Sequence, residues 1–262
     1  MTMKKGSYNF DEKNILEDEI ERLEKFSDFS KLIEELKILS DIGLEDNKVV
    51  FDLGCGTGNI DFEIAKHYKN CRVIGCDRNE YLINRALETK EREGISNIDF
   101  IIGDAEKIPV LDESVDFCYS RIVFQHLRNP RRVVKELYRI SKPGAIVAVV
   151  DTDDAGLILY PEPEGFSRFM KKIQKRQKEL GGDRFIGRKL YELLNAEFRD
   201  VNCKTIPISN KLIDNRKFID IFTGYKLSIL KDNNDNLLKS LSEWIKEDTW
   251  GTALCFMAYG KK

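Results

Sequence analysis

A glycine-rich turn between an apolar strand and an amphipathic helix constrains this chain more than any other feature. The β-favouring run 49–53 leads directly into Gly54-Cys55-Gly56-Thr57-Gly58, and a helical spacing of apolar residues starts at Ile60. Because glycine has no Cβ, such a turn can take positive φ and let a ligand lie against the backbone. The free amide groups of the first helical turn then face that ligand. The pattern predicts a strand, a ligand-binding turn and a helix.

A carboxylate follows the next apolar strand at a spacing typical of nucleotide sites. Asp77 ends the run 71–76, about 20 residues after Gly54, where nucleotide-binding units place an acid against ribose hydroxyls. The nicotinamide fingerprint Gly-x-Gly-x-x-Gly needs a third glycine at position 59, and this chain has Asn59 there. A nicotinamide oxidoreductase is therefore the weaker interpretation.

Five segments in order resemble the motifs of class I S-adenosylmethionine-dependent methyltransferases, of the small-molecule, type 11-like kind. They are Asp52 with the glycine turn, Asp77, Gly103-Asp104-Ala105, residues 120–127, and the turn and strand 142–150. The resemblance spans about residues 48–151. It implies a Rossmann-like α/β fold with a seven-stranded, mostly parallel sheet, an antiparallel last strand and helices on both faces.

The alternation of apolar runs and helical patterns predicts where these elements lie. The expected strands are 48–53, 71–76, 98–102, 115–120, 145–151, 201–208 and 253–259. The expected core helices are 58–68, 79–93, 130–141 and 187–195. Ligands of such sheets bind at the carboxyl ends of the strands, where Asp52, Asp77, Asp104, Ser120 and Asp151 fall. For Asp104 and Asp151, a helix-capping or turn role is an equally good interpretation.

The remaining segments predict a helical cap over the site. From the resemblance we expect residues 1–45 to form an N-terminal helical lid and residues 46–262 to form the methyltransferase domain. Two insertions, at about 153–185 and 210–248, complete the cap. The resemblance makes Tyr8 and Arg22 candidates to touch the ligand, Arg22 by pairing with the methionine carboxylate. The favoured interpretation of both is nevertheless a solvated residue on a helix or tail. The basic run within 168–178 is most simply a solvated helix face.

The resemblance also assigns residues to S-adenosylmethionine, whose product is S-adenosylhomocysteine. Asp52, Gly54, Cys55, Gly56, Thr57 and Gly58 would surround the methionine part, Asp77 would bind both ribose hydroxyls, and Arg78 belongs to the same set. Asp104 and Ala105 would meet the adenine. The residues from Ser120 through Arg121 to Gln125 would border the transferring methyl group.

His126 is the candidate catalytic residue. It follows the fourth predicted strand, and imidazole has an unperturbed pKa suited to general-base work at neutral pH. A structural role in the loop is the alternative. The expected reaction is methyl transfer to a small molecule by in-line displacement, with oxygen, nitrogen, sulfur and carbon acceptors all open. The competing hypotheses are a protein or peptide acceptor and a non-catalytic protein that only binds the cofactor.

The composition argues against several classes of binding partner. The 262 residues carry a net charge of −2, which argues against broad attraction to nucleic acid or anionic membranes. No apolar run is long enough to span a bilayer. The six cysteines form no Cys-x-x-Cys pair and there are only two histidines, so we expect a reduced, cytoplasmic protein without a bound metal.

Overall fold

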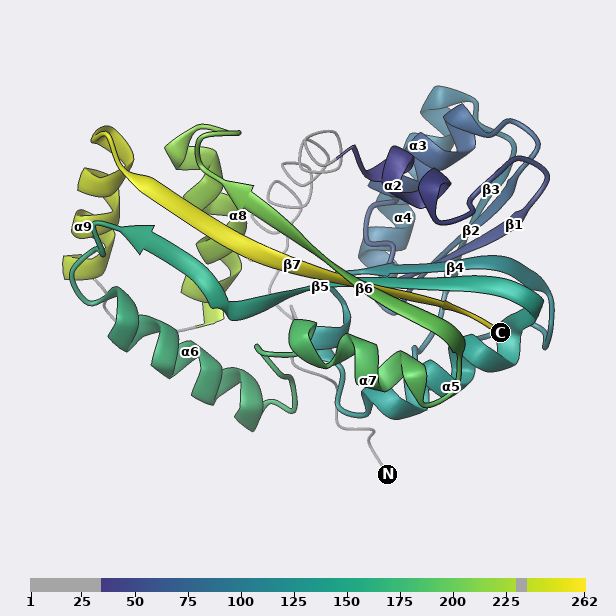
Figure 1. Ribbon diagram of the computed structural model, residues 1–262. Helices are drawn as coiled ribbons and strands as arrows, with labels where there is room; N and C mark the ends of the chain where they lie inside the picture. Colours follow the sequence, from purple (N-terminus) through teal and green to yellow (C-terminus); the bar gives the residue numbers. More distant parts are fainter. Residues whose placement is uncertain (1–33, 230–234) are drawn as a thin grey trace.

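In the computed structural model of the chain, residues 34–229 and 235–262 are described, and they form an α/β fold around one seven-stranded sheet (Figure 1). The strand order is β3-β2-β1-β4-β5-β7-β6. The strands are β1 (Val49–Leu53), β2 (Arg72–Asp77), β3 (Ile98–Ile102), β4 (Val115–Arg121), β5 (Ser141–Tyr160), β6 (Arg199–Ser209) and β7 (Trp250–Lys261). Each neighbouring pair among the first five strands is parallel. Strand β7 lies between β5 and β6 and is antiparallel to both. The predicted sheet is confirmed.

The helices begin and end where local chemistry dictates. They are α2 (Glu35–Asp41), α3 (Asn59–His67), α4 (Glu80–Glu93), α5 (Pro130–Ile140), α6 (Phe166–Glu179), α7 (Leu190–Asn195), α8 (Asn215–Ile229) and α9 (Asp235–Lys246), with 3₁₀ turns η1 (Phe124–His126) and η2 (Gly187–Lys189). The side chain of Asn79 accepts hydrogen bonds from the first amides of α4, and Gly94 ends that helix with φ of 64°. None of these helices, within the described ranges, is long and apolar enough to cross a bilayer.

Successive strand residues face opposite sides of the sheet, and each side is covered by its own helices. Val50 belongs to the cluster that includes residues of α2, α3 and α4, whereas Phe51 and Leu53 belong to the cluster that includes α5 and α7. Figure 1 shows α2, α3 and α4 on one side of the sheet and α5 and α7 on the other. Strand β1 is therefore buried on both faces, as expected for a central parallel strand covered by helices.

Strand β5 is longer than predicted. We expected it to end at 151 and the first insertion to begin at 153, but β5 runs to Tyr160 and pairs with β7 up to Tyr160 opposite Trp250. The register shifts between Asp153 and Ile158, and in this part of the strand Leu157 and Leu159 are buried in the core. The extension carries α6, α8 and α9 at its far end (Figure 1).

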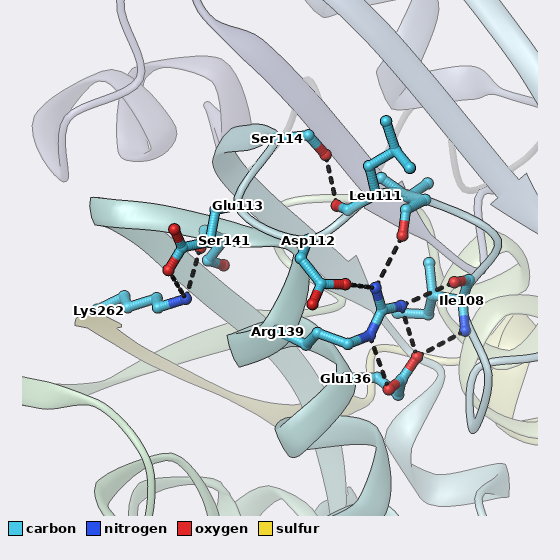
Figure 2. Close-up of polar contacts among 10 residues, drawn as sticks. Ile108, Leu111, Asp112, Glu113, Ser114, Glu136, Arg139, Ser141 and Lys262 are labelled. Atoms are coloured by element: carbon cyan, nitrogen blue, oxygen red, sulfur yellow. Dashed lines mark hydrogen bonds and ion pairs between the residues drawn. The ribbon is translucent and has the colours of Figure 1, made fainter.

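An arginine network fixes the loop that follows β3. Arg139 of α5 donates to the carbonyls of Ile108 at 2.8 Å and Val110 at 2.9 Å, and it pairs with Glu136 and Asp112 (Figure 2). The Arg139 guanidinium holds the pKa of Glu136 below its usual range, against the opposing effect of burial. This anchors the segment between β3 and β4 to α5, and the same segment carries Gly103 and Ala105.

Candidate functional site

A pocket of about 150 Å³ lies at the carboxyl ends of the first four strands. It is lined by the glycine turn after β1, by Asp77 and Arg78 at the end of β2, and by Gly103 and Ala105 after β3. At the end of β4 it is lined by residues 121–123 and His126. Four parallel strands end at this edge of the sheet, so segments far apart in sequence converge there. The pocket therefore runs along one line, from β3 through β2 and β1 to β4.

The glycine turn needs its glycines. Gly54, Gly56 and Gly58 have φ of 76°, 58° and 81°, a region that side chains with a Cβ rarely adopt. A Cβ on Gly54 would collide with the side chain of Val123, and one on Gly58 would lie 2.5 Å from the ring of Phe100. The turn therefore presents bare backbone to the pocket.

Asp77 is tied to this turn. Its Oδ2 accepts a hydrogen bond from the amide of Gly56 at 3.1 Å, and its Oδ1 accepts one from the amide of Asn79 at 2.8 Å. Burial raises the pKa of Asp77, while the two amides oppose that shift. Each carboxylate oxygen has a second lone pair, so the group can still accept from two hydroxyls of a ligand in the pocket.

A buried ion pair fastens α2 to the β4 side of the pocket. Nη1 of Arg121 lies 2.6 Å from Oε2 of Glu35, and the hydroxyl of Tyr119 donates to Oε1 of the same carboxylate. Burial, followed by the charge of Glu35, raises the pKa of Tyr119 well above its usual value. Arg121 is therefore oriented before any ligand arrives.

Two buried acids are neighbours at this end of the pocket. Asp52 lines the pocket, and the carboxyl group of Asp61 in α3 lies close to that of Asp52. Burial raises the pKa of both, that of Asp61 to about 7, and the neighbouring Asp61 carboxyl raises that of Asp52 further. Sequence analysis did not identify Asp61 or Glu35. A signal for Asp61 existed, because it sits between the apolar residues Ile60 and Phe62 on a buried helix.

His126 has a defined tautomer. Its Nδ1 lies 3.1 Å from Nε2 of Gln177 in α6, and the same Nε2 donates to the carbonyl of Gln125 at 3.0 Å. Since the carbonyl can only accept, the Gln177 amide must present its NH₂ group to both partners. Nδ1 of His126 then accepts, and the proton of the neutral ring resides on Nε2. In this tautomer the ring can donate a hydrogen bond through Nε2.

The structure brings most of the predicted site residues together. Asp52, Gly54, Cys55, Gly56, Thr57, Asp77, Arg78, Ala105, Arg121 and His126 line the pocket. Gly58, Asp104, Ser120 and Gln125 do not appear in its lining. Tyr8 and Arg22 lie outside the described residues.

The predicted residues that do not line the pocket support it instead. The hydroxyl of Ser120 donates to the carbonyl of Leu53 at 3.0 Å, and Oδ1 of Asp104 accepts from the amide of Glu106 at 2.8 Å. The side chain of Gln125 accepts from buried Arg184, and its amide donates to Asp151 at 3.0 Å. Asp151 therefore acts as a loop anchor, and burial raises its pKa to about 7. Within the described parts of the chain, no group of three or more His, Cys, Asp or Glu residues could hold a metal ion.

Comparison with known proteins decides the family. A family model described as "Methyltransferase domain" matches residues 44–224, well over half of the chain. The chain belongs to the methyltransferase family. This match covers every segment that lines the pocket of the methyltransferase.

Curated relatives and solved structures agree with this assignment. The sterol 24-C-methyltransferase of Aspergillus fumigatus is 34% identical over 42% of this chain and 29% of its own length. The malonyl-[acyl-carrier protein] O-methyltransferase of a Marinomonas species is 30% identical over 47% of this chain and 45% of its own. The chain thus spans less than half of the length of each of these relatives.

Two solved structures share the fold. Phosphoethanolamine N-methyltransferase 2 of Haemonchus contortus, in complex with S-adenosyl-L-methionine, has a TM-score of 0.60 at 20% identity and covers 87% of this chain and 52% of that one. A methyltransferase structure from Bacillus halodurans has a TM-score of 0.57 at 20% identity, with 87% and 97% covered.

The residues of the pocket fit S-adenosylmethionine, the cofactor of this family. The bare turn admits a ligand against the backbone, and the Asp77 carboxylate keeps acceptor capacity for two hydroxyls. The carboxyl groups of Asp52, Asp61 and Glu35 lie close together and favour a ligand with a positive charge.

Proposed function

We propose that this methyltransferase transfers a methyl group from S-adenosylmethionine to a small-molecule acceptor by in-line displacement. The observation that carries the proposal is the Asp77 carboxylate, held by the Gly56 and Asn79 amides at the rim of a glycine-lined pocket. When bound, the cofactor supplies a methyl group on a sulfonium, and the neutral thioether that remains after transfer is an intrinsically good leaving group. The protein then mainly has to align the reactants and exclude water.

Each part of the pocket has a role in this proposal. Asp77 binds the two ribose hydroxyls, Ala105 and the backbone of Gly103 contact the adenine, and Arg78 lies beside the ribose. The glycine turn, with Asp52, Cys55 and Thr57, surrounds the methionine part. Arg121, held by Glu35, borders the amino-acid end. Gly58, Asp104, Ser120 and Gln125 act by supporting this arrangement.

His126 is proposed to contact the acceptor. Its neutral tautomer places the proton on Nε2, so the ring can donate a hydrogen bond to an acceptor atom. To act as a general base, Nε2 would have to be unprotonated, which moves the ring proton to Nδ1. Nδ1 could then no longer accept the hydrogen bond from Gln177. The geometry therefore favours an orienting contact over proton removal.

The cap is also part of the proposal. Helix α6, from the first predicted insertion, contacts η1 through Gln177, which joins it to Gln125 and His126 at the pocket. Helices α8 and α9, from the second insertion, pack in the same core cluster as α6. We propose that these helices and residues 1–45 enclose the acceptor. An enclosed site favours a small acceptor over a protein or peptide.

The names of the relatives, a sterol and a malonyl-[acyl-carrier protein] methyltransferase, agree with a small acceptor or a small group on a carrier. The net charge of −2 favours neither nucleic acid nor an anionic membrane as partner. We further propose a cytoplasmic location, in keeping with the free cysteines of the described chain.

The test is formation of S-adenosylhomocysteine from S-adenosylmethionine during a screen of small-molecule acceptors. The expected result is acceptor-dependent product formation that Asp77→Ala strongly reduces. Tight cofactor binding without turnover on any acceptor, carrier-bound groups and peptides included, would favour the non-catalytic alternative.

A further inference from the structure

Four buried residues and the half-buried Arg121 form a polar cluster at the β1 and β4 side of the pocket. Glu35 comes from α2, Asp52 from β1, Asp61 from α3, and Tyr119 and Arg121 from β4. The exposed fractions of Asp61, Glu35 and Asp52 are 0%, 2% and 3%. We call these five residues the acid cluster. It contains three carboxyl groups and one guanidinium.

The one cation of the acid cluster is already engaged. Arg121 pairs with Glu35 at 2.6 Å, and Tyr119 donates to the same carboxylate. By contrast, Oδ1 of Asp52 and both oxygens of Asp61 accept no hydrogen bond from the N–H or O–H group of any other residue that the structure describes. Asp52 and Asp61 are therefore a carboxyl pair without a cation of their own.

Two ionised carboxylates cannot remain side by side in a dry site, because repulsion and desolvation both oppose the charged forms. Such a pair instead holds a proton between its members. The raised pKa values of Asp52 and Asp61 agree with this geometry. The groups that face the pair are Glu35 from α2, Tyr119 and Arg121 from β4, and the buried Cys55 thiol from the glycine turn.

The pair lies where a cationic part of the ligand would arrive. The pocket runs from Gly103 and Asp77 on one side to Asp52 and Arg121 on the other. A nucleoside whose ribose binds Asp77, as in the proposed function on which this inference rests, directs its amino-acid substituent towards Asp52. An ammonium group there would supply the positive charge that the carboxyl pair lacks.

We propose that Asp52 and Asp61 share a proton in the ligand-free protein and release it to solvent when the ammonium group of the cofactor enters the pocket beside Asp52. The carboxyl O–H bond breaks and the proton passes to a water molecule of the solvent, so one positive charge leaves the pair as another arrives. Asp61 does not line the pocket, so it is a positioning residue that acts through Asp52. Binding of the amino-acid part then becomes stronger as the pH rises towards the pKa of Asp61, about 7.

The test is isothermal titration at about pH 6, where the pair is protonated, in two buffers with different heats of ionisation. The probes are S-adenosylhomocysteine and 5′-methylthioadenosine, which lacks the amino-acid part. We expect release of about one proton per S-adenosylhomocysteine bound and close to none for 5′-methylthioadenosine. Asp61→Asn should bind both nucleosides but lose the release. Glu63→Gln, two residues along the same helix, should behave like the wild type.

Equal proton release for the two nucleosides, or undiminished release in Asp61→Asn, would overturn the inference. If Asp61→Asn does not fold, the comparison of the two nucleosides on the wild-type protein decides alone. Failure of both nucleosides to bind would instead refute the proposed function, so the two outcomes are distinguishable.

Discussion

The carboxylate of Asp77 accepts a hydrogen bond from the backbone amide of Gly56 at 3.1 Å, which joins the end of β2 to the turn after β1. The bond holds the glycine turn in the conformation that leaves its backbone bare. It also orients Asp77 along the rim of the pocket. This edge of the pocket is therefore assembled before a ligand arrives.

Replacing Asp77 with Ala should weaken binding of S-adenosylmethionine by roughly 1.5–3 kcal/mol, as expected for losing hydrogen bonds to a charged group. Isothermal titration measures the change. Asp99→Ala, which removes an exposed acid from the neighbouring strand β3, is the matched control and should bind normally. Unchanged affinity in Asp77→Ala would refute the ribose role.

The Gly56→Val protein should stay folded but fail to bind the cofactor. With φ of 58°, position 56 disfavours a β-branched residue, and the side chain would stand where the ligand meets the backbone. Gly94→Val is the control, since Gly94 has φ of 64° and open space around its missing Cβ. Circular dichroism and titration separate the effects on fold and on binding; cofactor affinity equal to that of the control would contradict the account.

Asp154→Ala should lower the free energy of unfolding by about 3 kcal/mol or more, because it removes the carboxylate between two buried cations. Arg184 approaches Asp154 at 2.8 Å and Lys226 at 3.1 Å. These cations overcome the effect of burial and lower the pKa of Asp154 to about 2. This stabilisation is thus present above about pH 4 and is lost as the pH falls towards 2. Urea unfolding measures the loss, and a change below about 1 kcal/mol would count against it.

The stability of the ligand-free protein should fall as the pH rises from about 4 to about 7. Asp61 and Asp151 both have a pKa raised to about 7 by burial, so the folded state holds their protons more tightly than the unfolded state does. The sign is therefore opposite to that for Asp154. Asp61→Asn should flatten part of this slope, as measured by denaturant unfolding at several pH values. A slope identical to that of the wild type would show that Asp61 titrates normally.

His126→Ala should lower kcat/KM about tenfold and leave cofactor affinity unchanged, as for losing one hydrogen bond to the acceptor. Gln177→Leu should weaken turnover in the same direction, because it releases the His126 ring. The measurement is a pH profile of kcat/KM once an acceptor is known. A loss of about 100-fold or more, with disappearance of the acidic limb, would identify His126 as a general base instead.

Much of the fold follows from local pattern. The short-range signals are the strand before the glycine turn, the acid at the end of β2, and the alternation of strands with helices. The structure confirms the sheet that they predict. The far half of β5 was not predictable in this way. Asp153 and Asp154 looked like the end of a strand, but their partners Arg188 and Arg184 lie about 30 residues later in the chain and allow both acids to be buried.

The site shows the same division. Motif spacing identified the residues at the strand ends that line the pocket. It could not separate them from Ser120 and Gln125, whose side chains turn towards Leu53 and Arg184. Nor could it reveal that Asp61 meets Asp52, since that contact depends on how α3 packs against β1. Side-chain direction, rather than residue type, distinguishes these cases.

The most direct test of the central claim is titration of the purified protein with S-adenosylmethionine, S-adenosylhomocysteine and NAD in parallel. The account predicts micromolar binding of the two sulfur nucleosides and no binding of NAD, because the turn lacks the third glycine of a dinucleotide site. Binding of NAD, or of none of the three, would contradict it.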